Sequence, residues 1–224
     1  MIERIVLPLA FGIGGAAILV SLGVWQMQRL AWKEGILAEI EVRVAAPPVP
    51  LPETPEPETH HYLPVEVTGT LAEPHIRVLV GQRGVGAGYR IISPMEANGR
   101  RILVDRGFIR TDAALPPLPE GPITVTGNLH WPDEVDGFTP EPDLMANIWF
   151  ARDVPALAAV LETEPVLLIA RQMSQSGGAL TPLPVDTSGI PNDHLNYAIT
   201  WFSLALVWMG MTLCLLWRTG KRTV

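Results

Sequence analysis

The chain has 224 residues, of which 48% are hydrophobic, and its mean hydropathy of +0.25 is high for a soluble protein. Its formal net charge of −7 argues against nucleic acid as a partner. The single cysteine, Cys214, excludes a disulfide framework within the chain and copper delivery through paired cysteines.

Two apolar segments account for most of the hydrophobicity. Residues 5–25 and 198–217 contain no Asp, Glu, Lys, Arg or His. At about 1.5 Å per residue, each helix would span roughly 30 Å, the thickness of a bilayer's hydrocarbon core. A secretory signal would be shorter and would end in a small-residue cleavage site, so we interpret the first segment as a retained anchor. The sequence predicts two transmembrane helices, in a bacterial protein.

The flanking charges predict the orientation. Of the 16 Lys and Arg residues, four lie outside residues 26–197, and of the 23 Asp and Glu residues one does, so the segment carries 12 against 22, a net charge of −10. Short basic tails stay in the cytoplasm. We therefore expect a multi-pass protein of the bacterial inner membrane with both termini cytoplasmic and the acidic central segment periplasmic.

The segment between the helices divides by composition. Residues 1–45 form the first helix with a polar extension, and residues 46–60 are a linker with six prolines in 47–58. A β-rich domain follows at 61–172, then a loop at 173–191 rich in Gly, Pro and Ser, the second helix at 192–218 and a tail at 219–224.

Short β-like segments separated by turn residues fill the central domain. The expected strands are 62–71, 76–82, 89–94, 101–109, 123–131, 147–151 and 166–171, with Asn98-Gly99 as a hairpin turn. Residues 154–162 predict one short helix, with Asp153 as its N-cap. The expected fold is an α+β membrane protein whose two helices flank a small antiparallel β-barrel or sandwich.

Sequence motifs for catalysis are missing. The chain has no G-x-S-x-G elbow, P-loop or H-E-x-x-H motif and no Cys or His pair at metal-ligand spacing. We interpret His60 and His61 as solvated loop residues. In "VDRG" (104–107), Arg106 is either a binding arginine or a locally paired residue at an edge or bulge that Gly107 permits. An enzyme is therefore the least favoured hypothesis.

The outer ends of both predicted helices combine aromatic and polar residues. Helical spacing places one set on a single face of the second helix: His194, Tyr197, Ala198, Trp201, Ala205 and Trp208. Trp25, Gln28, Arg29 and Trp32 repeat the arrangement on the first. Interfacial aromatics, with Arg29 on lipid phosphate, explain much of this pattern. A histidine there is also a suitable ligand for haem iron.

Motifs along the whole chain resemble the surfeit-locus (Surf/Shy) family of cytochrome c oxidase assembly proteins. They are "LGVWQMQRLAWK" (22–33), "GYRIISP" (88–94), "VDRGFI" (104–109), "NIWFARDV" (147–154) and "PNDHLNYAITWFSLA" (191–205). The family pattern usually has Asn at the position of Asp105 and Trp at that of Phe108, so Arg106-Gly107 is the matching pair.

This resemblance implies a non-enzymatic assembly factor that helps place haem a into oxidase subunit I. His194 is the implied iron ligand, and the other implied haem-binding residues are Tyr197, Trp201, Trp25, Gln26, Arg29 and Arg106. Subunit I, haem a synthase and membrane lipids are the expected partners. Two alternatives stay open: a scaffold that stabilises apo-subunit I without binding haem, and a membrane-anchored periplasmic enzyme.

Overall fold

The computed structural model describes residues 3–82, 85–175, 178–187 and 190–221. The chain forms two compact units. We call Met1–Glu39 with Thr187–Val224 the helix unit, and Ile40–Asp186 the sheet unit. The predicted helices at both ends and the β-rich segment between them are confirmed.

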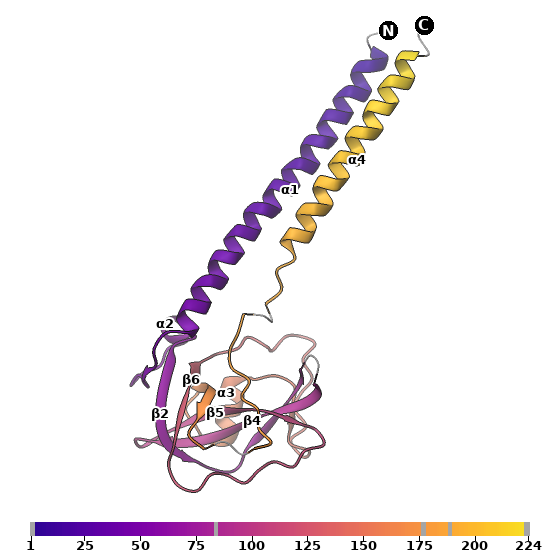
Figure 1. Ribbon diagram of the computed structural model, residues 1–224. Helices are drawn as coiled ribbons and strands as arrows, with labels where there is room; N and C mark the ends of the chain where they lie inside the picture. Colours follow the sequence, from indigo (N-terminus) through magenta and orange to yellow (C-terminus); the bar gives the residue numbers. More distant parts are fainter. Residues whose placement is uncertain (1–2, 83–84, 176–177, 188–189, 222–224) are drawn as a thin grey trace. The chain divides into compact units, whose positions relative to one another are not determined.

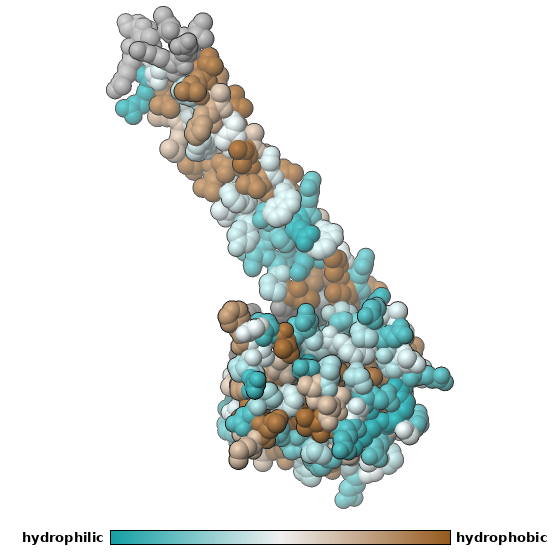
Figure 2. Space-filling view, turned by 180° about the vertical axis from the view of Figure 1, so that it is seen from behind, coloured by the Kyte–Doolittle hydropathy of each residue, from teal (hydrophilic) through white to brown (hydrophobic). Residues whose placement is uncertain are grey.

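Two long antiparallel helices make up most of the described part of the helix unit (Figure 1). Helix α1 spans Glu3–Val44, its last turn belonging to the sheet unit, and α4 spans His194–Lys221. Both are long and apolar enough to cross a membrane, and only 11% and 6% of their most apolar windows are buried. So little burial argues against core helices of a soluble protein. On the face seen in Figure 2, hydrophobic side chains cover much of the pair.

Small residues let the two helices approach closely. A Cβ atom added at Gly15 would lie 2.5 Å from the Trp208 ring. From α4, Ala198 and Ala205 are the buried residues. The Trp208 indole Nε1 donates a hydrogen bond of 3.0 Å to the Gly12 carbonyl. Close backbones and an interhelical hydrogen bond are the usual means of helix association in lipid.

Eight strands form one mixed sheet, the core of the sheet unit, in the part of the unit that the structure describes. All seven expected strands are present, with boundaries shifted by a few residues. The strands are β1 (Val49–Pro50), β2 (Pro64–Leu71), β3 (Ile76–Gln82), β4 (Gly86–Ala97), β5 (Arg100–Arg110), β6 (Ile123–Leu129), β7 (Ile148–Trp149) and β8 (Leu167–Met173).

The strand order is β1-β2-β6-β8-β5-β4-β3-β7, and an additional β2–β4 pairing closes a circuit of five strands. The expectation of an antiparallel sheet is wrong for three pairs, because β1–β2, β3–β7 and β5–β8 run parallel. Parallel pairing needs a crossover. The chain between β5 and β8, which includes β6 and α3, provides one.

Hydrophobic side chains are buried on both faces of β5. Ile102 and Val104 belong to one core cluster, whereas Leu103 belongs to a second cluster that also includes residues of helix α3 (Val154–Leu161). The Asp153 carboxylate accepts a hydrogen bond of 3.1 Å from the Ala156 amide, which confirms the predicted N-cap. The Asn98-Gly99 hairpin is also confirmed: both residues have positive φ, 51° and 75°.

The proline-rich linker contains two short ordered elements. Strand β1 pairs with β2, and helix α2 (Pro57–His60) follows it. Proline has no backbone N–H to donate. It is tolerated at both places because an edge strand and the first turn of a helix contain backbone amides that make no hydrogen bond within the sheet or helix.

Candidate functional site at the helix pair

His194 is the first residue of α4, and it contacts Gln26 of α1. The distance between His194 Nδ1 and Gln26 Oε1 is 2.8 Å. Gln26 is 9% exposed, and His194 is partly buried. An amide oxygen only accepts hydrogen bonds, so Nδ1 carries the proton and donates it. With the proton on Nδ1, Nε2 is the ring nitrogen that points away from Gln26, and an unprotonated Nε2 is the form of a histidine that binds a metal.

The aromatic residues expected around His194 differ in exposure. Trp201 is partly buried, whereas Tyr197 and Trp25 are 56% and 53% exposed. The predicted polar and aromatic face of α4 is therefore divided. Its alanines are buried and Trp208 contacts α1, while Tyr197 lies to the exposed side.

Arg29 is exposed and stacks on a neighbouring ring. Its guanidinium carbon lies 3.7 Å from the centre of the Trp32 ring, one turn further along α1. Within the part of the chain that the structure describes, no carboxylate forms an ion pair with Arg29. Its positive charge is therefore available to an external anion.

Arg106 lies in the sheet unit and is 1% exposed. The alternative of local pairing finds no support at Nε and Nη1, which are buried without a hydrogen-bond partner among the described residues. Burial lowers the pKa of its guanidinium. The fully buried side chain presents no surface to a cofactor, so the structure gives no support to Arg106 as a binding residue.

The bulge expected beside Arg106 is present, but β5 is not an edge strand. Gly107 has a φ of +110°, and the β4–β5 register shifts between Arg90 and Ile92. Asp105, fully buried, pairs with Arg90 at 2.5 Å and accepts a hydrogen bond from the Gly107 amide. Strand β5 lies between β8 and β4.

A second polar cluster surrounds His130 in the sheet unit. His61 Nε2 lies 2.7 Å from His130 Nδ1, and the His61 ring stacks on Tyr62. The expectation that His61 is a solvated loop residue is therefore wrong. His60 is held too, because its Nδ1 accepts a hydrogen bond of 3.0 Å from the Glu56 amide.

Burial and nearby cations keep both imidazoles of this cluster neutral. Burial, Arg152 and His61 are the main causes that lower the pKa of His130 to about 3. Burial and Arg43 lower the pKa of His61. Burial alone would raise the pKa of Glu134, but hydrogen bonds from Arg152 lower it. Among the described residues, no group of three or more His, Cys, Asp or Glu side chains is arranged to hold a metal ion.

The fold and the site define a class of protein. It has two membrane-length helices, a mixed-sheet unit and a histidine of one helix hydrogen-bonded to a glutamine of the other. The SURF1 family matches residues 14–206. The chain therefore belongs to the SURF1 family, as its motifs indicated.

Relatives from animals, a choanoflagellate and a bacterium support this assignment. Surfeit locus protein 1 of Homo sapiens is 31% identical over 210 residues, covering 83% of this chain and 69% of that protein. The SURF1-like protein of Monosiga brevicollis is 31% identical, with 91% and 85% covered. The SURF1-like protein of Rickettsia felis is 30% identical, with 84% and 88% covered.

Proposed function

We propose that this protein is a non-enzymatic assembly factor for cytochrome c oxidase, which binds haem a transiently at His194 and assists its insertion into subunit I. The proposal is supported by family membership and, above all, by the hydrogen bond between the His194 ring and Gln26. The hydrogen bond from Nδ1 to Gln26 orients the imidazole and leaves Nε2 as a ligand.

The residues around His194 suit such a cargo. Haem iron accepts one axial bond from imidazole nitrogen, and the porphyrin offers an apolar plane and two carboxylates. Tyr197, Trp201 and Trp25 supply aromatic surface, and Arg29 supplies an unneutralised guanidinium for a carboxylate. A single protein ligand holds the cargo weakly enough to release it, as delivery requires.

The proposed setting is the bacterial inner membrane, with both termini cytoplasmic and the sheet unit periplasmic, near subunit I, haem a synthase and lipid. Single cysteines introduced into the sheet unit of a Cys214→Ser variant test this orientation. A membrane-impermeant maleimide should label them in cells whose outer membrane has been permeabilised. Labelling only after the inner membrane is disrupted would contradict it.

Haem content tests the site. The wild-type protein, produced in cells that make haem a and purified in detergent, should carry haem detectable by its absorption spectrum, and His194→Ala should lose it. Gln26→Leu should retain less, because removing the partner of a ligating histidine typically lowers metal affinity about 10–100-fold. Asn196→Ala, an exposed polar change on α4, is the matched control and should retain haem. Equal content and spectra in wild type and His194→Ala would refute the ligand assignment.

A scaffold for apo-subunit I is the second candidate, because the helices leave most of their apolar surface unburied. This surface suits contacts with other membrane helices. The scaffold hypothesis predicts a stable complex with apo-subunit I and no haem in the isolated protein. Haem that is present in the wild-type protein and absent from His194→Ala would contradict the scaffold hypothesis.

A further inference from the structure

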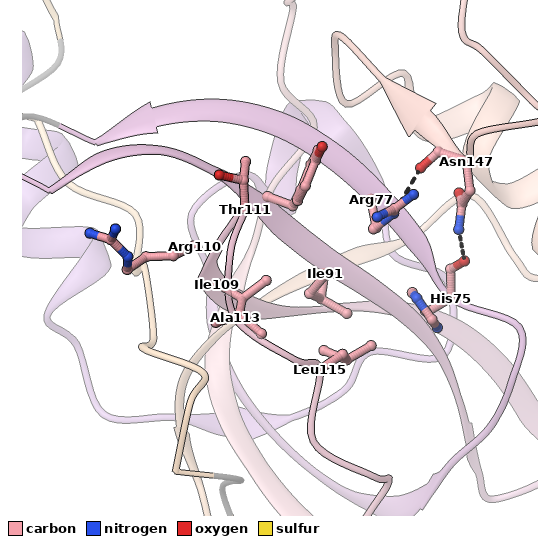
Figure 3. A pocket seen from close by; sticks show the side chains of 10 residues that line it. His75, Arg77, Ile91, Ile109, Arg110, Thr111, Ala113, Leu115 and Asn147 are labelled. Atoms are coloured by element: carbon pink, nitrogen blue, oxygen red, sulfur yellow. Dashed lines mark hydrogen bonds between the residues drawn. The ribbon is translucent and has the colours of Figure 1, made fainter.

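A pocket of about 270 Å³ lies in the sheet unit beside strands β3, β4 and β5. Figure 3 shows Arg77 and His75 on one side of it, Arg110 on the opposite side, and Ile91, Ile109 and Leu115 between them. The two isoleucines are buried, and Leu115 packs against them. The pocket therefore has an apolar floor between cationic side chains.

The Arg77 guanidinium is held in place without being neutralised. Its Nε donates to the Asn147 carbonyl at 3.3 Å, and its Nη2 donates to the Ala146 carbonyl. The guanidinium carbon lies 5.0 Å from the centre of the Tyr89 ring. No described carboxylate forms an ion pair with Arg77. A guanidinium has five N–H donors, and the two carbonyls accept from two of its nitrogens. The remaining N–H donors of Arg77 can therefore bind an anion.

The other basic side chains of the pocket already have partners. Arg110 pairs with Asp112 at 2.9 Å, and His75 pairs with Glu73 at 2.9 Å. Arg77 is therefore the cation with an unmet charge. The planar guanidinium matches the geometry of a carboxylate, which it can bind through parallel hydrogen bonds.

The segment that holds Arg77 is fixed before any ligand binds. Asn147 has a φ of +52°, and its Nδ2 donates a hydrogen bond of 2.9 Å to the His75 carbonyl. The backbone amide and carbonyl of Asp143 pair with those of Ile148, which closes the turn. A positive φ in a residue other than glycine is commonly found where a ligand is clamped.

Size and surroundings indicate a polypeptide ligand. The volume falls just below the roughly 300–1,000 Å³ of small-molecule sites, so it suits about one residue. An Asp or Glu side chain has too short a stem to cover the floor, whereas a C-terminal residue carries an apolar side chain and a free carboxylate together. The turn that holds Arg77 also exposes Leu144 by 66% and Met145 by 101%, which offers apolar contacts to preceding residues.

We propose that this pocket binds the C-terminal residue of a partner polypeptide, with the terminal carboxylate on Arg77 and an apolar side chain on Ile91, Ile109 and Leu115. Leu144 and Met145 contact the residues before it. The partner is thus a protein that ends in an apolar residue, and the interaction is independent of the haem site.

N-acetyl-leucine is the probe, and N-acetyl-leucinamide is its uncharged counterpart. Binding to the full-length protein in detergent is measured by saturation-transfer NMR. The amide should bind at least about tenfold more weakly, as loss of a charge-assisted hydrogen bond implies. Arg77→Gln should weaken N-acetyl-leucine similarly, Arg77→Lys should restore part of the affinity, and Arg171→Gln, outside the pocket, should leave it unchanged. Equal affinities for acid and amide, or for wild type and Arg77→Gln, would overturn the carboxylate site.

Two further probes test the source of the carboxylate. 4-Methylpentanoate has the same side chain and carboxylate without a peptide bond, and it should bind more weakly than N-acetyl-leucine. N-acetyl-alanyl-valyl-leucine should bind more tightly, and Met145→Ser should remove that gain. Equal binding of 4-methylpentanoate and the tripeptide would overturn the polypeptide assignment.

Discussion

Acidification from about pH 7.5 to about pH 5 should destabilise the sheet unit through His130. Its imidazole is held by His61 and faces Arg152, Arg90 and Glu134, with a pKa of about 3 against an ordinary value of 6.5. The unfolded chain therefore binds a proton over a range where the folded chain does not. The stabilisation is fully present above pH 6.5 and is lost as the pH falls from 6.5 towards 3.

The expected loss follows from the two pKa values of His130. A pH of about 5 is about 1.5 units below the ordinary pKa of 6.5, so His130 is almost fully protonated in the unfolded chain. In the folded chain, where its pKa is about 3, the ring is neutral at this pH. One unit corresponds to about 1.36 kcal/mol, so the free energy of unfolding should fall by about 2 kcal/mol. At about pH 5 the Glu134 carboxylate stays ionised, because its pKa is lowered from 4.5.

Urea unfolding of the full-length protein in detergent measures this loss. Trp131, whose Nε1 donates to the Pro165 carbonyl at 2.9 Å, reports on the sheet unit by fluorescence. His130→Gln keeps a neutral polar side chain and removes the titration, so it should show about 2 kcal/mol less pH dependence. Equal pH dependence in the two proteins would refute the reasoning.

Two glycine substitutions test the packing, each against a glycine whose added Cβ meets nothing within 4 Å. Gly15→Ala should weaken the helix pair by about 1–3 kcal/mol in a detergent-denaturation titration, because its Cβ overlaps the Trp208 ring, whereas Gly14→Ala should not. Gly107→Ala should lower the urea midpoint of the sheet unit strongly, since φ is +110° and its Cβ would overlap the Thr181 carbonyl. Gly81→Ala is the control for Gly107→Ala. If both variants lowered the urea midpoint equally, the steric explanation for Gly107 would be contradicted.

Local patterns predict most elements of this fold but not their pairing. The helices follow from uninterrupted apolar windows, and α3 follows from its Asp153 cap. The parallel pairing of β5 with β8 depends on strands about 60 residues apart, and nothing in either strand specifies its direction. Strand β1 lies in the segment predicted to be a linker. Its proline-rich sequence is typical of an extended linker and does not indicate a pairing of only two residues with β2.

The same limit applies to the sites. Helical spacing identifies His194, but its hydrogen-bond partner Gln26 lies 168 residues away, so only the resemblance indicated that Gln26 matters. His61 was misinterpreted because its hydrogen-bond partner His130 lies 69 residues away in sequence. Asp105 pairs with Arg90 on the adjacent strand, 15 residues away in sequence, which the local pattern of "VDRG" does not predict.

The closed circuit of strands restricts how other proteins can bind the sheet unit. A partner that adds a strand needs a long free edge, but the outermost strands, β1 and β7, have two residues each. Beyond β7, only the short stretch 79–82 of β3 lacks a strand partner on that side among the described residues. Such short edges also discourage pairing between copies of the chain. Recognition by this unit should therefore depend on side chains and pockets rather than on backbone augmentation, and the unit should resist aggregation while it awaits its partners.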